Sequence, residues 1–224
     1  MKRILLWLFL FSLLTACAGA SGPTATQPAP TSIPTEAPPE LDPVTPALTR
    51  SVEVSTLPAP ADDFFTQMGI SLPAPACASL TQSQTEGPYY KPDTPERHSL
   101  LEEGMPGTRL LLAGYVLDQN CQPLPNAWLD FWQADANGEY DNAGYRLRGH
   151  QFTDLQGRYH LETVLPGLYS SRPIEHIHVK VQPEGGGVVT SQLYFPERPV
   201  EGLTVMVEDR GDYLLGYFSF VVQR

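Results

Sequence analysis

The sequence has few cysteines, few basic residues and no evident internal repeat. Only 14 of its 224 residues are Lys or Arg, against 25 Asp and Glu, and the formal net charge is −11. That balance argues against binding nucleic acid or anionic lipid through a general basic face. It does not restrict the binding of a small aromatic molecule. Hydrophobic residues make up 42% of the chain, which is enough for a buried core.

The chain also lacks a long hydrophobic run at its start. Two basic residues precede an apolar stretch, residues 4–14, which is too short to cross a bilayer as a stable helix. The residues Leu14 to Cys17 then resemble a bacterial lipobox. We therefore expect a lipoprotein signal peptide over 1–16 and a lipid-modified Cys17; ordinary signal cleavage nearby is the alternative. Acyl chains would anchor the protein to the bacterial cell membrane, outside the cytoplasm.

The cysteine count agrees with an extracytoplasmic location. Without Cys17 two cysteines remain, Cys77 and Cys121, an even number in an oxidising compartment. We expect a disulfide between them, which would tie the N-terminal approach to the first hairpin. Two free buried thiols are the alternative.

Proline divides the chain into parts. Ten of the 23 prolines lie within residues 17–61, among Thr, Ala and Ser and without apolar periodicity. Such a segment cannot bury enough surface to offset its ordering entropy, so we expect a disordered, extended tether. We expect residues 62–76 to form a short extension that contains a short helix, and residues 77–224 to form the folded domain.

That domain is expected to be all-β. Apolar residues occur in short runs or alternate with polar ones, and Asn-Gly, Gln-Gly, Pro-Gly and Gly-Gly turn signals separate the runs. Short strands at close spacing indicate a β-sandwich. The expected strands lie in 110–117, 127–132, 158–163, 176–181, 188–195 and 216–223.

The candidate site centres on His176-Ile177-His178. Alternate side chains of a strand share a face, so both imidazoles point one way, with Cα atoms roughly 6.6 Å apart. Tyr140 and Tyr169 each follow a turn signal containing glycine. Two imidazoles and two phenolates form a hard, anionic ligand set that suits ferric iron better than zinc or copper. On spacing alone, a strand with two surface histidines and two packed tyrosines remains the alternative.

Six segments in one order carry a family resemblance. Together they resemble the intradiol ring-cleavage dioxygenases, the superfamily of catechol and protocatechuate 3,4-dioxygenases, and the resemblance implies the β-sandwich of that family. The segments are Thr85–Tyr90, Trp132–Tyr140, Thr153–Tyr159, Leu165–Tyr169, His176–His178 and Ser191–Phe195.

The resemblance implies an enzyme with mononuclear non-haem Fe(III), and it assigns the metal ligands Tyr140, Tyr169, His176 and His178. A catechol-type diol and O2 would be the substrates, and a cis,cis-muconate-type acid the product. Tyr169 would leave the metal when substrate binds and would take up a substrate proton. The competing interpretations are a non-catalytic metal- or ligand-binding surface module and a zinc or copper hydrolase.

Two further residues match the family. Arg172 would stabilise negative charge on the substrate, and Gln192 would hydrogen-bond substrate oxygens. Arg172 stands four residues before His176, where the family usually has three, so one extra residue could re-aim its guanidinium. The other histidines, His98, His150 and His160, are expected to be solvated.

Overall fold

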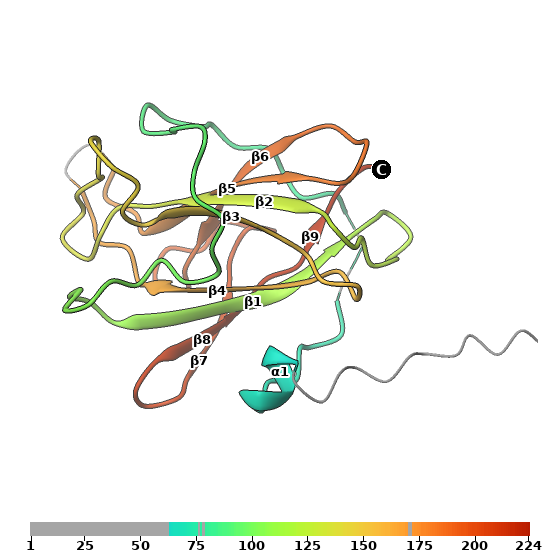
Figure 1. The fold of residues 1–224 in the computed structure, drawn as a ribbon, viewed down its shortest axis with the longest axis horizontal. Helices are drawn as coiled ribbons and strands as arrows, with labels where there is room; N and C mark the ends of the chain where they lie inside the picture. The colour runs from blue at the N-terminus through green and yellow to red at the C-terminus, as the bar shows by residue number, and fades with distance from the viewer. Residues whose placement is uncertain (1–62, 76, 78, 170–171) are drawn as a thin grey trace, which may run out of the picture. The chain divides into compact units, whose positions relative to one another are not determined.

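Two β-sheets, in which most neighbouring strands are antiparallel, pack face to face in the computed structural model (Figure 1). The structure describes residues 63–75, 77, 79–169 and 172–224. The expected signal peptide, Cys17 and the tether of residues 17–61 lie outside these residues. One sheet has the order β4-β1-β8-β7, with β9 paired to the end of β1, and the other has the order β3-β2-β5-β6. The strands of the first are β1 (Arg109–Leu117), β4 (Arg158–Val164), β7 (Met206–Asp209), β8 (Leu214–Tyr217) and β9 (Phe220–Val221).

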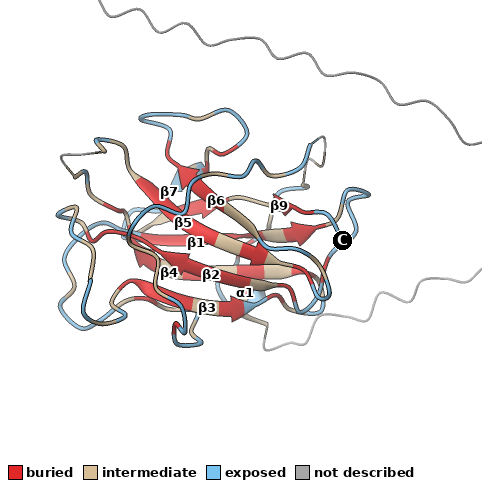
Figure 2. Cartoon of the chain, turned by 90° about the horizontal axis from the view of Figure 1, so that it is seen from above, coloured by how far each residue is buried: buried red, intermediate tan, exposed pale blue. Residues whose placement is uncertain are grey.

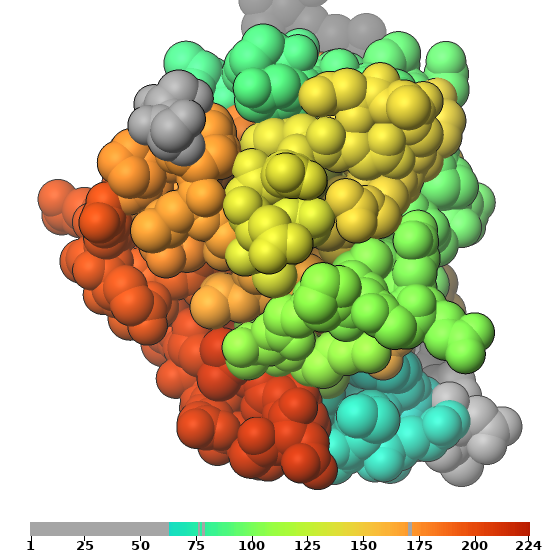
Figure 3. Space-filling view, turned by 90° about the vertical axis from the view of Figure 1, so that its left-hand side faces the viewer, coloured from blue at the N-terminus to red at the C-terminus, as the bar shows by residue number. Residues whose placement is uncertain are grey.

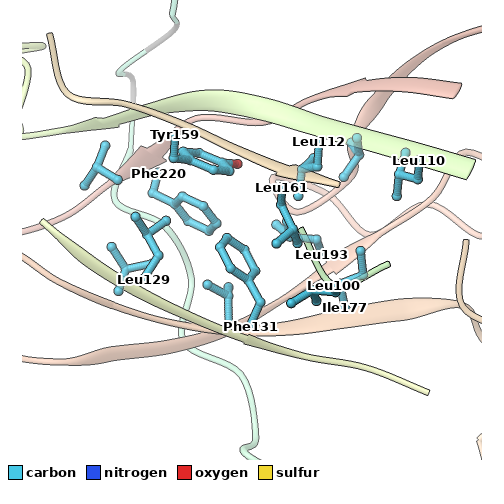
Figure 4. Packing of buried hydrophobic residues seen from close by; sticks show 14 of the residues in the cluster. Leu100, Leu110, Leu112, Leu129, Phe131, Tyr159, Leu161, Ile177, Leu193 and Phe220 are labelled. Atoms are coloured by element: carbon cyan, nitrogen blue, oxygen red, sulfur yellow. The ribbon is translucent and has the colours of Figure 1, made fainter. Parts of the chain in front are cut away.

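The second sheet carries the candidate site. Its strands are β2 (Trp128–Trp132), β3 (Arg148–Phe152), β5 (His176–Gln182) and β6 (Val189–Tyr194). Both sheets turn apolar side chains inward, where Leu112, Phe131, Leu161, Ile177 and Phe220 are fully buried and lie together (Figure 4). The buried residues follow the strands, and the connecting segments are mostly exposed (Figure 2). The expected all-β sandwich is confirmed.

Two strands do not follow from the apolar pattern. β3 has the sequence Arg-Gly-His-Gln-Phe, and it forms because it pairs along its whole length with β2. β7 is a short edge strand whose side chains are largely exposed. Neither strand has the alternation of apolar and polar residues that identifies a strand locally.

The short helix expected in the N-terminal extension is present as α1 (Phe64–Gln67), against the outer face of the first sheet (Figure 1). The Asp63 side chain caps it by accepting a hydrogen bond from the Thr66 amide at 3.3 Å. Phe65 packs with Leu111 and Leu215 in a second apolar cluster. Among the described residues no helix is long and apolar enough to cross a bilayer.

The expected disulfide is confirmed. Cys77 is bonded to Cys121, with the two Cα atoms 5.6 Å apart and a sequence separation of 44. The bond connects the segment before the first strand to the turn between β1 and β2. It therefore holds the N-terminal approach against the first sheet.

Candidate metal centre

The two site histidines lie on the outer face of the second sheet. On β5 the side chains of Ile177 and Val179 enter the core with no exposed surface, whereas His176 and His178 point to the opposite face. Both histidines are nevertheless only 2% exposed, because loops cover this face. The interpretation as surface histidines is therefore wrong.

A row of buried side chains crosses all four strands beside His178. Trp132 pairs with Arg148 on one side and with His178 on the other, and His178 pairs with Gln192. Each of the four is at most 2% exposed. The Trp132 ring stacks on the His178 ring with centroids 4.8 Å apart and planes at 8°. This stacking fixes the plane of the imidazole before any ligand binds.

Two turns bring the site tyrosines together. Gly138 and Gly167 pack against each other's segments so closely that a Cβ on Gly138 would lie 2.1 Å from the Leu168 carbonyl oxygen, and one on Gly167 would lie 2.3 Å from the Ala136 oxygen. Tyr140 follows the first turn and Tyr169 the second. In Figure 3 the segment between β2 and β3 (yellow) and the segment between β4 and β5 (orange) lie side by side on one face.

The donor atoms of these four residues converge. The Tyr140 hydroxyl lies 3.4 Å from His176 Nε2, and His176 Nε2 lies 3.2 Å from His178 Nε2. The Tyr169 ring meets the Tyr140 ring edge-on with centroids 5.8 Å apart, and it lies 5.9 Å from the His176 ring. The structure thus brings all four predicted ligands into one cluster, although 36 residues separate Tyr140 from His176.

The histidines are prepared to bind a cation. His176 Nδ1 is 2.7 Å from the Ile174 carbonyl oxygen and must donate its proton to it, so Nε2 carries a lone pair. Burial lowers the pKa of both imidazoles, that of His178 to about 2, which keeps them neutral and able to ligate metal. The His176 Nε2 lone pair faces His178 Nε2 at 3.2 Å, so either a proton on His178 Nε2 or a metal ion must lie between the two nitrogens.

The two phenols can become anionic ligands only beside a highly charged cation. Burial raises the pKa of Tyr140 and of Tyr169, so both are protonated in the absence of a cation. A trivalent cation strongly favours the phenolate form. No group of three His, Cys, Asp or Glu within the described residues could hold a metal. The cluster of two histidines and two tyrosines fits ferric iron and is a poor site for zinc.

Arg172 reaches the cluster despite the extra residue before His176. Its guanidinium donates a 3.0 Å hydrogen bond to the Tyr194 hydroxyl. Its charge also opposes the effect of burial on the pKa of Tyr169. The structure therefore places a cation against the tyrosine that is expected to leave the metal.

Gln192 is fully buried, and both ends of its amide are engaged. Its nitrogen donates to the Thr85 carbonyl oxygen at 2.6 Å, and its oxygen accepts from the Tyr194 hydroxyl at 2.9 Å. A continuous chain of hydrogen bonds thus runs from Arg172 through Tyr194 and Gln192 to Thr85. In this arrangement Gln192 supports the site through Tyr194.

Tyr89, which belongs to the segment Thr85–Tyr90 that carries the family resemblance, stacks on Tyr140 with centroids 4.3 Å apart and meets Tyr169 edge-on, so it forms a wall of the cluster. Three other residues of the site were not predicted. Tyr194 could have been found, because it follows Gln192 by two residues on the same strand face. Trp132 and Arg148 could not, because only the pairing of β2 with β3 and β5 brings them to His178.

The segment from residue 86 to residue 94 is fastened over this face by polar contacts. Buried Asp130 accepts hydrogen bonds from Thr94 at 2.7 Å and from Tyr90 at 3.2 Å. Lys180 pairs with Glu86 at 2.6 Å and lies 3.6 Å from the centre of the Tyr90 ring. The segment lies directly against His178, since a Cβ on Gly87 would be 3.4 Å from His178 Cε1.

Comparison with known proteins gives a consistent result. A family model described as "Dioxygenase" matches residues 85–201. The chain is 28% identical over 144 residues to catechol 1,2-dioxygenase of Acinetobacter baylyi, covering 51% of this chain and 46% of that protein. It is 32% identical over 141 residues to the protocatechuate 3,4-dioxygenase alpha chain of Pseudomonas putida, covering 52% of this chain and 70% of that one. The chain spans about half the length of the two catechol 1,2-dioxygenases, from Acinetobacter baylyi and Candida albicans, to which it is similar.

Solved structures agree with these relatives. The dioxygenase domain of a dioxygenase carbohydrate-binding protein fusion from Streptomyces sp. SirexAA-E is 45% identical, with a TM-score of 0.63, covering 65% of this chain and 99% of that one. The 3-chlorocatechol 1,2-dioxygenase of Rhodococcus opacus 1CP is 27% identical, with a TM-score of 0.60, covering 65% of this chain and 74% of that one.

Proposed function

Because the chain belongs to the intradiol ring-cleavage dioxygenase family, we propose that it cleaves a catechol-type ring with O2 between the two hydroxyl-bearing carbons. Both oxygen atoms would enter the product, a cis,cis-muconate-type diacid, so no further reductant is required. The observation that carries the proposal is the gathering of Tyr140, Tyr169, His176 and His178 into one cluster.

These four side chains would hold a mononuclear Fe(III). The neutral imidazoles offer Nε2 lone pairs, and the two phenols lose their protons to become anionic ligands. When bound, the ferric ion supplies Lewis-acid chemistry, which favours the phenolates and the catechol dianion and makes the ring reactive toward O2. The stacking of Trp132 on His178 and the Ile174 carbonyl at His176 hold both rings in position.

Two residues would handle the charge and protons of the substrate. Tyr169, once deprotonated, would accept a proton from a substrate hydroxyl at its phenolate oxygen. Arg172 would then stabilise the negative charge that remains on the substrate. The hydrogen bonds through Tyr194 and Gln192 keep the guanidinium aimed at the cluster.

The test is an anaerobic titration of the purified iron-loaded protein with catechol, followed by admission of O2. We expect a burgundy-red protein, a new absorption band on addition of catechol, and a muconate product in the ultraviolet after O2. A coloured protein that binds catechols without forming a muconate would instead favour the non-catalytic binding module. A colourless protein that holds stoichiometric zinc would overturn the iron assignment.

For the location, we propose an extracytoplasmic domain attached to the bacterial cell membrane through a lipid on Cys17. The support is the lipobox-like Leu14 to Cys17 and the disulfide-bonded pair of cysteines. Cys17→Ser should release the protein from the membrane fraction of expressing cells or leave it unprocessed. Equal membrane retention of mutant and wild type would contradict lipidation at this residue.

A further inference from the structure

Arg148 lies at the start of β3, behind the metal cluster, and has no exposed surface. It shares a face of the sheet with Trp132, its direct partner on β2, and Trp132 in turn stacks on His178. No ion pair within the described residues involves Arg148. Burying a guanidinium without a carboxylate partner costs free energy, so the contacts of Arg148 must offset that cost.

All three hydrogen bonds of the Arg148 side chain go to main-chain carbonyls. Nη1 donates to Tyr89 at 2.6 Å, and Nη2 and Nε donate to Asp141 at 3.0 and 3.3 Å. Tyr89 and Asp141 are 52 residues apart in sequence, and the guanidinium joins their backbones. The planar fork of arginine can bridge two acceptors in this way, whereas a lysine ammonium is a single point.

The two carbonyls belong to the segments that carry the Tyr89–Tyr140 ring pair. Asp141 directly follows Tyr140, and the Tyr89 ring stacks on the Tyr140 ring at 4.3 Å. Fixing both backbones therefore fixes the position of the Tyr140 hydroxyl relative to His176, which lies 3.4 Å away. Arg148 also places a positive charge near Tyr140, which opposes the effect of burial on the pKa of that phenol.

We propose that Arg148 is a positioning residue: it holds Tyr89 and Tyr140 in the geometry that binds the metal. The role in metal binding rests on the proposed function. The tie between the two backbone segments does not, because the bonds exist without a bound ion.

Arg97 provides a matched control. It also donates only to main-chain carbonyls, those of Tyr145 and Arg148, and it lies against Gly149. It therefore holds the same loop, but it makes no hydrogen bond to Tyr89 or Asp141 in the described structure. If the arginines only stabilise the loop, substitution of either one should have the same effect. If Arg148 has a specific role at Tyr140, only its substitution should disturb that tyrosine.

The experiment compares Arg148→Lys and Arg97→Lys with wild type, first without metal and then with Fe(III). In the metal-free proteins, hydrogen exchange should accelerate in peptides covering 86–91 and 139–143 only for Arg148→Lys. Fe(III) affinity, measured by chelator competition, should fall about 10- to 100-fold for Arg148→Lys, as is usual for a group that orients a metal ligand. Arg97→Lys should stay within about threefold, and the phenolate-to-iron absorption band should shift only in Arg148→Lys.

Each result is decisive. Unchanged exchange at 86–91 and 139–143 in Arg148→Lys overturns the proposal, whatever becomes of the catalytic assignment. Equal loss of iron affinity in both variants also overturns it, because the effect then belongs to the loop as a whole. If wild type binds no Fe(III), the proposed function fails, and the metal-free exchange data still decide whether Arg148 joins the two segments. If wild type binds Fe(III) and cleaves no catechol, the enzyme assignment fails and the affinity comparison still applies.

Discussion

At the scale of single residues, two buried tyrosine hydroxyls donate similar hydrogen bonds but have different roles. The Tyr159 hydroxyl donates to the Phe218 carbonyl oxygen at 2.8 Å, within the core. The Tyr194 hydroxyl donates to Gln192 at 2.9 Å and accepts from Arg172 at 3.0 Å. Removal of the first hydroxyl affects the folded state in general, and removal of the second frees the guanidinium at the site.

Tyr194→Phe should therefore lower kcat about tenfold or more, because a small misplacement of Arg172 weakens its interaction with the substrate. Iron affinity should change by less than about threefold, since no ligand is removed. The control Tyr159→Phe should lower the free energy of unfolding by about 1 kcal/mol and leave kcat unchanged. Steady-state kinetics, chelator competition and urea denaturation measure the three quantities. Equal kcat in wild type and Tyr194→Phe would show that Arg172 is held by other contacts.

At the scale of elements, the site depends on the contact between two turns. Gly138 has a φ of +83° and lies against the backbone of Leu168, next to Tyr169. Gly185 has a similar φ of +71°, but nothing lies within 4 Å of the place where its Cβ would be. The two glycines thus share a backbone conformation and differ in their surroundings.

Gly185→Ala should cost about 1 kcal/mol of unfolding free energy, the strain of alanine in the left-handed region. Gly138→Ala should cost about 1–3 kcal/mol more, because the added methyl must push the Leu168 backbone away. It should also weaken Fe(III) binding, since the two tyrosines separate. Urea denaturation and chelator competition test this, and equal behaviour of the two variants would argue against a role for the turn contact.

The disulfide attaches the segment before the first strand to the rest of the domain. It closes a loop with a sequence separation of 44 between Cys77 and Cys121. Loop-closure entropy gives a stabilisation of about 4 kcal/mol for that length. The double variant Cys77→Ala/Cys121→Ala should lose an amount of that order in urea denaturation. Dithiothreitol should destabilise wild type and leave the double variant unchanged; a double variant as stable as oxidised wild type would contradict the estimate.

At the scale of the whole molecule, buried and partly buried histidines contribute to the response to acid. His160, expected to be solvated, is instead stacked between Phe64 and His98, with ring centroids 3.6 and 4.6 Å away. Burial lowers its pKa to about 4 and, in the metal-free site, lowers those of His176 and His178 as well. In the unfolded chain all three take up a proton near pH 6.5.

The metal-free protein should therefore lose stability as the pH falls below about 6.5, because the unfolded state then binds more protons than the folded state. Each imidazole contributes at most about 1.4 kcal/mol per pH unit. His160→Gln should flatten the decline between pH 6.5 and 4.5 and have no such effect above pH 7. Burial raises the pKa of Asp130, so this carboxyl adds stability as the pH falls. Its contribution is the same in wild type and His160→Gln and cancels when the two proteins are compared. Parallel stability curves from urea denaturation would contradict this role of His160.

Features that depend on local spacing can be predicted from the amino-acid sequence. The two-residue period of a strand places His176 and His178 on one face whatever the rest of the chain does, and glycine-containing turns precede both tyrosines. The apolar runs likewise predicted the strands that fill the core. The cysteine count predicted the bond between Cys77 and Cys121.

Contacts between residues that are distant in sequence follow from the packing of the whole domain. β3 has no apolar alternation, so its pairing with β2, and the position of Arg148 beside Trp132, depend on contacts made elsewhere in the sheet. The burial of His178 and the engagement of the Gln192 amide arise because the segment around residue 85 crosses the outer face. Side-chain spacing within a strand is a property of the local backbone, whereas strand order and loop coverage are set by the packing of the whole domain.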